Sequence, residues 1–338
     1  MVNNYTTQFS TKSSCAIALL TFNLQGCQMY TRKSGVLPKP LMVQNLGRTV
    51  RTVMILLFLT GCGGASSTSI NTTEPDGTLD QIPIRLLKPD GRGPFPAVVI
   101  MHDCSGLGPR SSGAPERWAK ELLGRGYVIL IPDSFTTRGH ADGVCTDPSP
   151  GRRDVSPSRR VSDAYAALAY ARTLSFVDPP RVGLMGASHG GSTVLASMVA
   201  PRNQKDGFAA AVALYPGCAA QYGDWRVVRT AGLRTPIIRY VGAYKPVAPL
   251  FILIGEKDDW TPAEPCRKLA EAAQAAGYPV TIKVYPEAHH AFDSDRPVRY
   301  VGQRVNLNSS TGRGATTGGD PQAGPIVLMR SFHFSEST

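Results

Sequence analysis

Short apolar runs alternate with helical patterns through the middle of the chain. The runs at 96–101 and 250–254 are continuously apolar, which is typical of parallel strands covered on both faces. Alanine-rich or amphipathic segments, such as 162–172 and 263–276, lie between the runs and predict helices. Strands and helices that alternate at this spacing predict an α/β fold, with a mostly parallel central sheet and helices on both faces.

The predicted elements follow one another over residues 79–285. We expect strands at 79–87, 96–101, 127–131, 181–185, 208–215, 250–254 and 280–285, and helices at 115–123, 162–172, 192–200 and 263–276. The polar stretch 136–157 is predicted to be a long loop over the ligand-binding edge of the sheet. The stretch 221–246 has no clear pattern, and 301–338 is predicted to be a C-terminal tail that could end in a last helix.

The segment 42–62 has the pattern of an export signal. Arg48 and Arg51 precede an apolar run at 53–59 that is too short to span a bilayer, and Leu59-Thr60-Gly61-Cys62 follows. This ending resembles the bacterial lipobox, so we expect a lipoprotein-type signal segment with lipidation at Cys62. Residues 1–41 are then an untranslated or unstructured extension, or else a separate N-terminal domain. The Ser-, Thr- and Gly-rich segment 63–77 is predicted to be a flexible linker.

The positive charge of the chain is concentrated near its N-terminus. Of the net charge of +11, six charges lie in residues 1–62, which contain no acidic residue. The remaining +5 is spread along the chain, which favours an ordinary solvated surface over nucleic-acid binding. We therefore expect contact with a membrane only through an N-terminal lipid anchor.

Four of the 7 cysteines lie within the predicted α/β region. An even number of cysteines in an exported protein suggests disulfide bonds. Three pairings are open, and we favour the one in which each pair lies on loops that follow strands, on the same side of the sheet. The favoured pairs are Cys104 with Cys145 and Cys218 with Cys266. None of these cysteines has metal-ligand spacing, so we expect no metal site.

The segment 186–190 carries the strongest chemical signal. Its sequence Gly-Ala-Ser-His-Gly follows a predicted strand and precedes a predicted helix, as in a nucleophile elbow, where a strained turn exposes the serine hydroxyl at the edge of the sheet. Ser188 is the candidate nucleophile. The alternative is that Ser188 is only a turn residue that tolerates tight packing.

A serine nucleophile needs a base and an acid, which in this kind of fold follow in the order serine, acid, histidine. His289 and His290 lie just past the strand at 280–285, while His333 is a weaker candidate near the C-terminus. Asp258 and Asp259 follow the strand at 250–254, and spacing alone leaves both open. Asp258 could instead cap the next helix.

Stabilisation of the transition state needs two N–H donors that point at the developing oxyanion. We expect one from the backbone of His189, directly after the nucleophile. The second should come from the loop after the strand at 96–101, where the backbone of Cys104 is the best-placed donor.

Three motifs together resemble the dienelactone hydrolase family of α/β-hydrolases: 186–191 (Gly-Ala-Ser-His-Gly-Gly), 255–258 (Gly-Glu-Lys-Asp) with Pro262, and 287–292 (Glu-Ala-His-His-Ala-Phe). The resemblance covers about residues 78–300 and implies an α/β-hydrolase fold. It assigns the acid to Asp258 and the base to His290, and it places the oxyanion loop at 103–106. The enzymes that give the family its name carry a cysteine nucleophile and a glutamate in that loop, whereas this chain has Ser188 and Asp103. The resemblance therefore implies general ester hydrolysis rather than action on the lactone.

We therefore predict a serine hydrolase that cleaves a carboxylic ester or related acyl bond of a small molecule through an acyl-enzyme, without a metal or organic cofactor. The expected location is outside the cytoplasm of a bacterium, lipid-anchored at the membrane or periplasmic. The alternatives are a peptidase-like hydrolase of the same fold and a catalytically silent ligand-binding lipoprotein.

Overall fold

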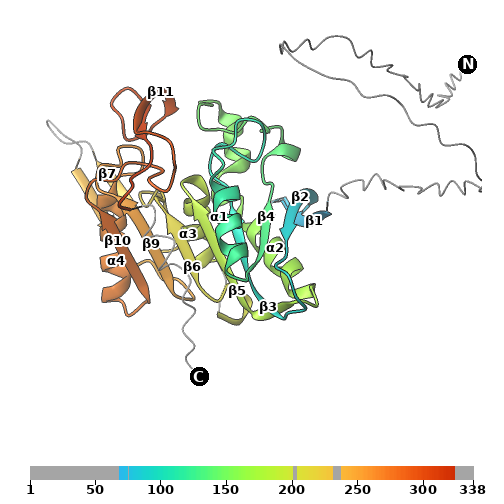
Figure 1. Ribbon diagram of the computed structural model, residues 1–338. Coiled ribbons are helices and arrows are strands. Elements are labelled where there is room, and N and C mark those ends of the chain that lie inside the picture. Colours follow the sequence, from blue (N-terminus) through green and yellow to red (C-terminus); the bar gives the residue numbers. More distant parts are fainter. Residues whose placement is uncertain (1–67, 75, 201–203, 231–236, 324–338) are drawn as a thin grey trace, which may run out of the picture. The chain divides into compact units, whose positions relative to one another are not determined.

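The computed structural model describes residues 68–74, 76–200, 204–230 and 237–323 (Figure 1). The expected extension at 1–41, the signal segment with Cys62, the candidate His333 and most of the expected last helix lie outside these residues. Within the described part of the chain, no helix has both the length and the apolar character that a membrane crossing requires.

An eight-stranded sheet forms the centre of the described structure. Its strands lie in the order β1-β2-β4-β3-β5-β6-β9-β10, and β4 and the strands that follow it in this order are parallel. Strand β2 is antiparallel to both of its neighbours. The bounds of the strands are β1 Thr68–Thr73, β2 Leu79–Leu87, β3 Phe95–Met101, β4 Val128–Pro132, β5 Val177–Ala187, β6 Ala211–Leu214, β9 Leu250–Gly255 and β10 Val280–Tyr285. The predicted mostly parallel sheet is confirmed.

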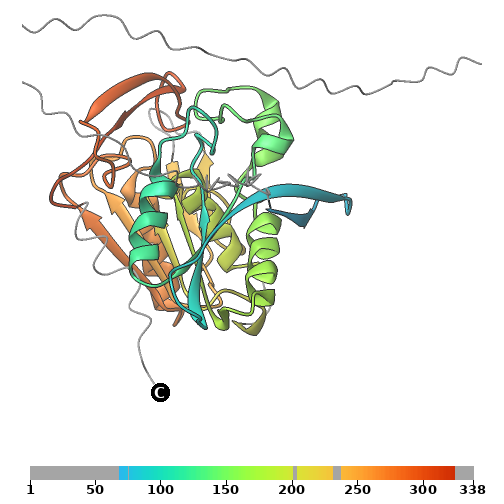
Figure 2. The ribbon, with the colours of Figure 1, turned by 45° about the vertical axis from the view of Figure 1, so that its right-hand side comes forward.

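Helices cover both faces of this sheet. Helix α1 (Ala114–Gly124) and helix α2 (Val161–Thr173) lie on opposite faces (Figure 2). Helix α3 (His189–Met198) packs against α2, β5 and β6, and α4 (Ala263–Ala275) packs on β9 and β10. The central strands are apolar along their length because both faces are covered, and every residue of β4 is buried.

The predicted flexible linker at 63–77 is wrong for residues 68–73, which form β1 and pair with β2. Ile70 and Thr72 are buried while their neighbours are exposed or partly exposed, which is the alternation of an edge strand. The Thr72 hydroxyl donates a 2.9 Å hydrogen bond to Asp163 of α2. Threonine favours strands as well as linkers, so the composition of this segment did not distinguish the two.

The predicted tail at 301–338 is wrong over residues 301–317, and the boundary set at residue 300 falls inside a strand. Strands β11 (Arg299–Val305) and β12 (Arg313–Thr317) form an antiparallel hairpin. In Figure 1 this hairpin lies at the top edge of the molecule, close to the carboxyl ends of the parallel strands. A second hairpin, β7 (Arg226–Thr230) and β8 (Ile237–Val241), occupies the stretch at 221–246 that had no clear pattern.

The long loop at 136–157 contains two short 3₁₀ helices, Thr136–Arg138 and Pro150–Val155, and a third, Gln204–Asp206, precedes β6. The loop packs onto the segment that follows β3: Val144 donates a 2.7 Å backbone hydrogen bond to the carbonyl of Cys104. The disulfides Cys104–Cys145 and Cys218–Cys266 are both present, so the favoured pairing is confirmed.

Candidate active site

Ser188 lies in the sharp turn between β5 and α3. Its backbone angles, φ 54° and ψ −114°, are unusual for a residue with a side chain. The turn needs glycine on both sides, because a Cβ at Gly186 would clash with the carbonyl of Gly190, and a Cβ at Gly190 would clash with that of Met101. The main chain of Ser188 donates a 2.9 Å hydrogen bond to Leu214 of β6. The predicted elbow geometry is therefore present.

The structure brings Ser188, His290 and Asp258 into one line of hydrogen bonds. Nε2 of His290 lies 2.9 Å from Oγ of Ser188, and Nδ1 lies 2.8 Å from Oδ2 of Asp258. All three residues are at least nine-tenths buried. His290 and Asp258 come from the loops after β10 and β9, so the carboxyl ends of neighbouring parallel strands bring them together.

Asp259 and His289, the residues next to Asp258 and His290, make their hydrogen bonds elsewhere. The carboxylate of Asp259 accepts 2.8 Å hydrogen bonds from the backbone N–H and the hydroxyl of Thr316, which tie it to the β11–β12 hairpin. Nδ1 of His289 lies 3.0 Å from the carbonyl of Lys257, away from Ser188. The ambiguity that spacing left between the two aspartates is therefore resolved by contact: only Asp258 reaches His290.

Asp258 does not cap the next helix, which was the alternative for it: the N-cap residue of α4 is Pro262, without a side-chain hydrogen bond. Asp258 instead holds the turn that precedes the helix. Its Oδ1 accepts hydrogen bonds from the backbone N–H groups of Trp260 (2.9 Å) and Thr261 (2.8 Å). The Thr261 hydroxyl lies 2.9 Å from Oδ2 of Asp258 and 3.1 Å from Nδ1 of His290. The two roles coexist, because one oxygen holds the turn before α4 and the other faces the histidine.

Two aromatic rings that the sequence analysis did not identify enclose His290. The rings of Tyr215 and Trp260 each lie 4.7 Å from the imidazole, between centroids. The Tyr215 hydroxyl donates a 2.7 Å hydrogen bond to Asp293, and burial, reinforced by that carboxylate, raises the pKa of Tyr215 well above its usual value. Proximity in sequence to Asp258 and His290 was the one signal that pointed to Trp260 and Asp293.

The loop after β3 is held by Asp103. Its carboxylate accepts a 2.7 Å hydrogen bond from the Ser105 backbone and further hydrogen bonds from the hydroxyls of Ser105 and Ser112. Cys104 and His189, the two predicted oxyanion donors, both line the same pocket as Ser188. Asp103 therefore fixes the conformation of the segment that carries the Cys104 N–H.

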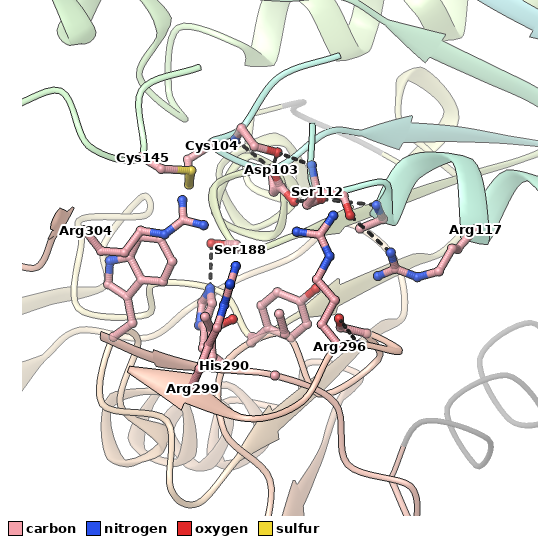
Figure 3. Close-up of a pocket in the computed structure, with 18 of the residues that line it drawn as sticks. Asp103, Cys104, Ser112, Arg117, Cys145, Ser188, His290, Arg296, Arg299 and Arg304 are labelled. Atoms are coloured by element: carbon pink, nitrogen blue, oxygen red, sulfur yellow. Dashed lines mark hydrogen bonds between the residues drawn. A yellow bond between two sulfur atoms is a disulfide. The ribbon is translucent and has the colours of Figure 1, made fainter. Parts of the chain in front are cut away.

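Two pockets meet at Ser188, Cys104, Cys145 and Trp260. The first is lined by four arginines and a single acidic residue, Asp103. The arginines are Arg117, Arg296, Arg299 and Arg304, and Figure 3 shows the last three pointing toward the space above Ser188. The second has apolar walls at Val144, Pro157 and Leu307 among polar residues.

The arginines of the first pocket differ in whether they have an ion-pair partner. Arg117 lies 3.7 Å from Asp293, whereas no ion pair involves Arg296, Arg299 or Arg304 within the described part of the chain. Arg304 lies over the Trp260 ring at 5.1 Å, and its Nε is buried without a hydrogen-bond partner. Burial lowers the pKa of the Arg304 guanidinium. This pocket therefore has excess positive charge.

One group of side chains among the described residues has a geometry that could suit a metal ion: Asp103, Cys104 and Cys145. Both sulfur atoms are joined in the disulfide, so neither cysteine offers a thiolate ligand.

The order of the sheet, the antiparallel β2 and the serine turn after β5 define an α/β-hydrolase fold. The sequence model of the dienelactone hydrolase family matches residues 82–310, and the chain belongs to this family. The match extends into the β11–β12 hairpin, beyond the boundary at 300 that the sequence analysis expected.

Individual relatives have low sequence identity to this chain. Proteins named "Putative carboxymethylenebutenolidase" from Methylorubrum extorquens and from Synechocystis are 29% and 28% identical to this chain. The first alignment covers 63% of this chain and 69% of the relative, and the second covers 68% and 87%. Among solved structures, esterase 2 of Thermogutta terrifontis phosphorylated by paraoxon is 17% identical, with a TM-score of 0.49 over 78% of this chain and 90% of that chain.

Proposed function

We propose that this protein is a serine hydrolase that cleaves a carboxylic ester or related acyl bond through an acyl-enzyme at Ser188. The observation that carries the proposal is the buried line of hydrogen bonds from Asp258 through His290 to Ser188. Such a line lets a base remove the serine proton while a carboxylate holds that base in one orientation.

In the proposed reaction, Nε2 of His290 takes the proton of Ser188 as Oγ attacks the acyl carbon. The protonated imidazole, stabilised by Asp258, then gives this proton to the departing alcohol oxygen, and the acyl group stays on Ser188. A water molecule attacks the acyl-enzyme in the second half, with His290 as its base, and releases the acid and free Ser188. The N–H groups of Cys104 and His189 are proposed to stabilise the oxyanion in both halves.

Steady-state turnover of a substrate panel tests the proposal. The panel contains 4-nitrophenyl esters of increasing acyl length, a lactone, and 4-nitroanilides of the same acyl groups. We expect turnover of the esters. Turnover of the anilides at comparable rates would instead support the peptidase-like alternative, and a folded protein that hydrolyses none of these substrates would contradict the proposal. The Ser188–His290 hydrogen bond of 2.9 Å argues against a catalytically silent binding protein.

We further propose that the ester carries an anionic group. Arg299 and Arg304 come from the β11–β12 hairpin, neither has an ion-pair partner among the described residues, and both line the pocket that contains Ser188. A guanidinium binds a carboxylate or phosphate more strongly than a neutral group. The apolar walls of the second pocket suit an uncharged part of the same substrate.

The double variant Arg299→Gln/Arg304→Gln is expected to lower kcat/KM for an anionic ester by about tenfold or more, because a hydrogen bond to a charged group contributes roughly 1.5–3 kcal/mol. The measurement compares 4-nitrophenyl hemiglutarate with neutral 4-nitrophenyl valerate. The matched control is Arg313→Gln, since Arg313 is exposed on the same hairpin and does not line the pocket. An equal loss for both esters would contradict the anion-binding role.

The two disulfides support the proposal that the protein works outside the cytoplasm, because such bonds persist in oxidising compartments. A lipid anchor at Cys62 is part of the same proposal and rests on the sequence alone. Fractionation of cells that express Cys62→Ala tests it: loss from the membrane fraction supports the anchor, and unchanged membrane association contradicts it.

Removal of the Cys104–Cys145 disulfide is expected to lower kcat by about tenfold, because this bond joins the proposed oxyanion loop to the long loop after β4. The experiment compares Cys104→Ala/Cys145→Ala with Cys218→Ala/Cys266→Ala. The two bonds span 41 and 48 residues, so chain entropy predicts similar losses of stability for both. The second pair should keep its kcat, and equal effects on kcat would contradict a specific role for the first.

A further inference from the structure

Arg160, the residue before α2, is completely buried directly behind the turn that contains Ser188. No carboxylate among the described residues lies within ion-pair distance of it, and its Nε has no hydrogen-bond partner. Burial lowers its pKa to about 10, an effect that the charges of Asp163 and Asp103 partly offset, so the group remains protonated at neutral pH. Burial of a guanidinium without a carboxylate partner reduces the free energy of unfolding. That the protein retains one here indicates a role for its remaining hydrogen bonds.

Those contacts connect the two segments that carry the proposed oxyanion donors. One terminal nitrogen of Arg160 donates a 2.8 Å hydrogen bond to the carbonyl of His102, two residues before Cys104. The other lies 2.8 Å from Nδ1 of His189, the residue that follows Ser188. A guanidinium can only donate, so Nδ1 of His189 must be the acceptor.

The surroundings make this connection rigid. The guanidinium lies 5.0 Å from the centre of the Phe135 ring, which also packs edge-on against the imidazoles of His102 and His189. His102 stays neutral, because burial and the charge of Arg160 place its pKa well below the usual value. Its Nε2 accepts a 3.2 Å hydrogen bond from the Ser134 backbone, so Nδ1 carries the proton that it shares with the carbonyl of Asp103.

We propose that Arg160 is a positioning residue that sets the spacing between the Cys104 and His189 N–H donors. The proposal rests on the proposed serine hydrolase function. Because Arg160 does not line either pocket at Ser188, its effect on substrate binding is small. Its effect appears in the transition state, where both donors must reach one oxygen at about 2.7–3.1 Å.

The test is a comparison of Arg160→Lys and Arg160→Met with the wild type. We expect kcat to fall by about 10–100-fold in Arg160→Met, the loss typical of a misplaced oxyanion donor, with KM changed less than about threefold. Arg160→Lys keeps the charge but cannot reach both partners with a planar fork, so its kcat should be intermediate.

Arg138 offers a matched control, because it is a second arginine whose side chain is largely buried, here against Asp163 of α2. Its guanidinium pairs with Asp163 (2.7 Å) and Glu74 (2.9 Å) and contacts neither oxyanion segment. Arg138→Lys and Arg138→Met should lower the melting temperature and leave kcat per folded molecule unchanged. If the Arg138 variants lose kcat as the Arg160 variants do, the positioning role is overturned.

A second variant covers the case in which Arg160→Met does not fold. His189→Leu removes the Nδ1 acceptor but keeps the backbone N–H, and we expect it to lower kcat by about tenfold. Adding Arg160→Lys to His189→Leu should then lower kcat by a smaller factor than Arg160→Lys does in the wild type, because the two side chains act through one contact. Additive losses, or a folded Arg160→Lys protein with wild-type kcat, would overturn the proposal.

Turnover by the wild type and by Ser188→Ala distinguishes failure of the positioning role from failure of the proposed function. Turnover that depends on Ser188 but not on Arg160 removes the positioning role alone. A folded wild type without turnover removes both.

Discussion

Replacement of Ser188 by alanine is expected to lower kcat/KM for ester hydrolysis by about 10⁴-fold or more. Without Oγ there is no acyl-enzyme, and only the proposed oxyanion donors and substrate binding would remain to speed direct attack by water. The variant should stay folded, because the hydrogen bond to Leu214 and the turn geometry depend on the main chain. Initial rates on the preferred 4-nitrophenyl ester, together with the melting temperature, measure both effects.

Ser197 provides the matched control for that variant. It lies in α3, the helix that begins directly after Ser188. It is fully buried, and its hydroxyl has no hydrogen-bond partner among the described residues. Ser197→Ala should therefore keep its kcat/KM within about twofold, as expected for a change that breaks no interaction. Ester turnover in Ser188→Ala that matches the Ser197→Ala control would contradict the assignment of the nucleophile.

Asp258→Asn should lower kcat by about 10³–10⁴-fold, the second-largest effect that we expect. An amide at this position can donate as well as accept, so it no longer holds Nδ1–H of His290 in place, and the imidazole loses the negative charge that stabilises its protonated form. Asparagine has almost the same shape as aspartate, so its side-chain oxygen can still accept the hydrogen bonds that the backbones of Trp260 and Thr261 donate to Oδ1 of Asp258.

The neighbouring variant Asp259→Asn separates this effect from general damage to the loop. Asp259 contacts Thr316 of the hairpin rather than His290, so we expect a loss of a few-fold at most, arising from a looser hairpin. Steady-state kinetics of the two purified variants under identical conditions give the comparison. Similar kcat values would show that the carboxylate at position 258 has no special role.

The central strands and the serine turn were predictable because their signals are local. A continuous apolar run can only be a strand or helix covered on both faces, and the Gly-Ala-Ser-His-Gly motif specifies a turn that tolerates no larger neighbours at Gly186 and Gly190. The order of strands then places the loops that contain Asp258 and His290 at the same edge as Ser188. Local pattern therefore identified Ser188 and the two loops, and the resemblance to the dienelactone hydrolase family was needed to choose Asp258 and His290 within them.

The hairpin β11–β12 was not predictable, because distant residues hold it in place. Strand β11 is largely exposed, and neither strand carries much apolar alternation. Trp260 Nε1 donates a 2.8 Å hydrogen bond to the carbonyl of Val305, and Val305 donates a 2.9 Å hydrogen bond to that of Cys145. Such polar contacts leave no periodic trace in the sequence, so the arginines that the hairpin brings to the site could be found only in three dimensions.

The burial of Arg160 and Arg138 was also not predictable from the sequence. Both lie in sequence among charged and polar residues that suggest a solvated surface, yet both are buried in the structure, one against His189 and one against Asp163. Sequence pattern identifies which strands form the sheet, but it does not identify which charged side chains fold back beneath the loops.

Covalent labelling of the full-length wild-type protein with a fluorophosphonate, followed by peptide mapping by tandem mass spectrometry, tests directly whether Ser188 is the nucleophile. We expect one adduct per molecule, located on Ser188, lost in Ser188→Ala and formed much more slowly in Asp258→Asn. A folded protein that takes up no label, or takes it up at another residue, would contradict this role of Ser188.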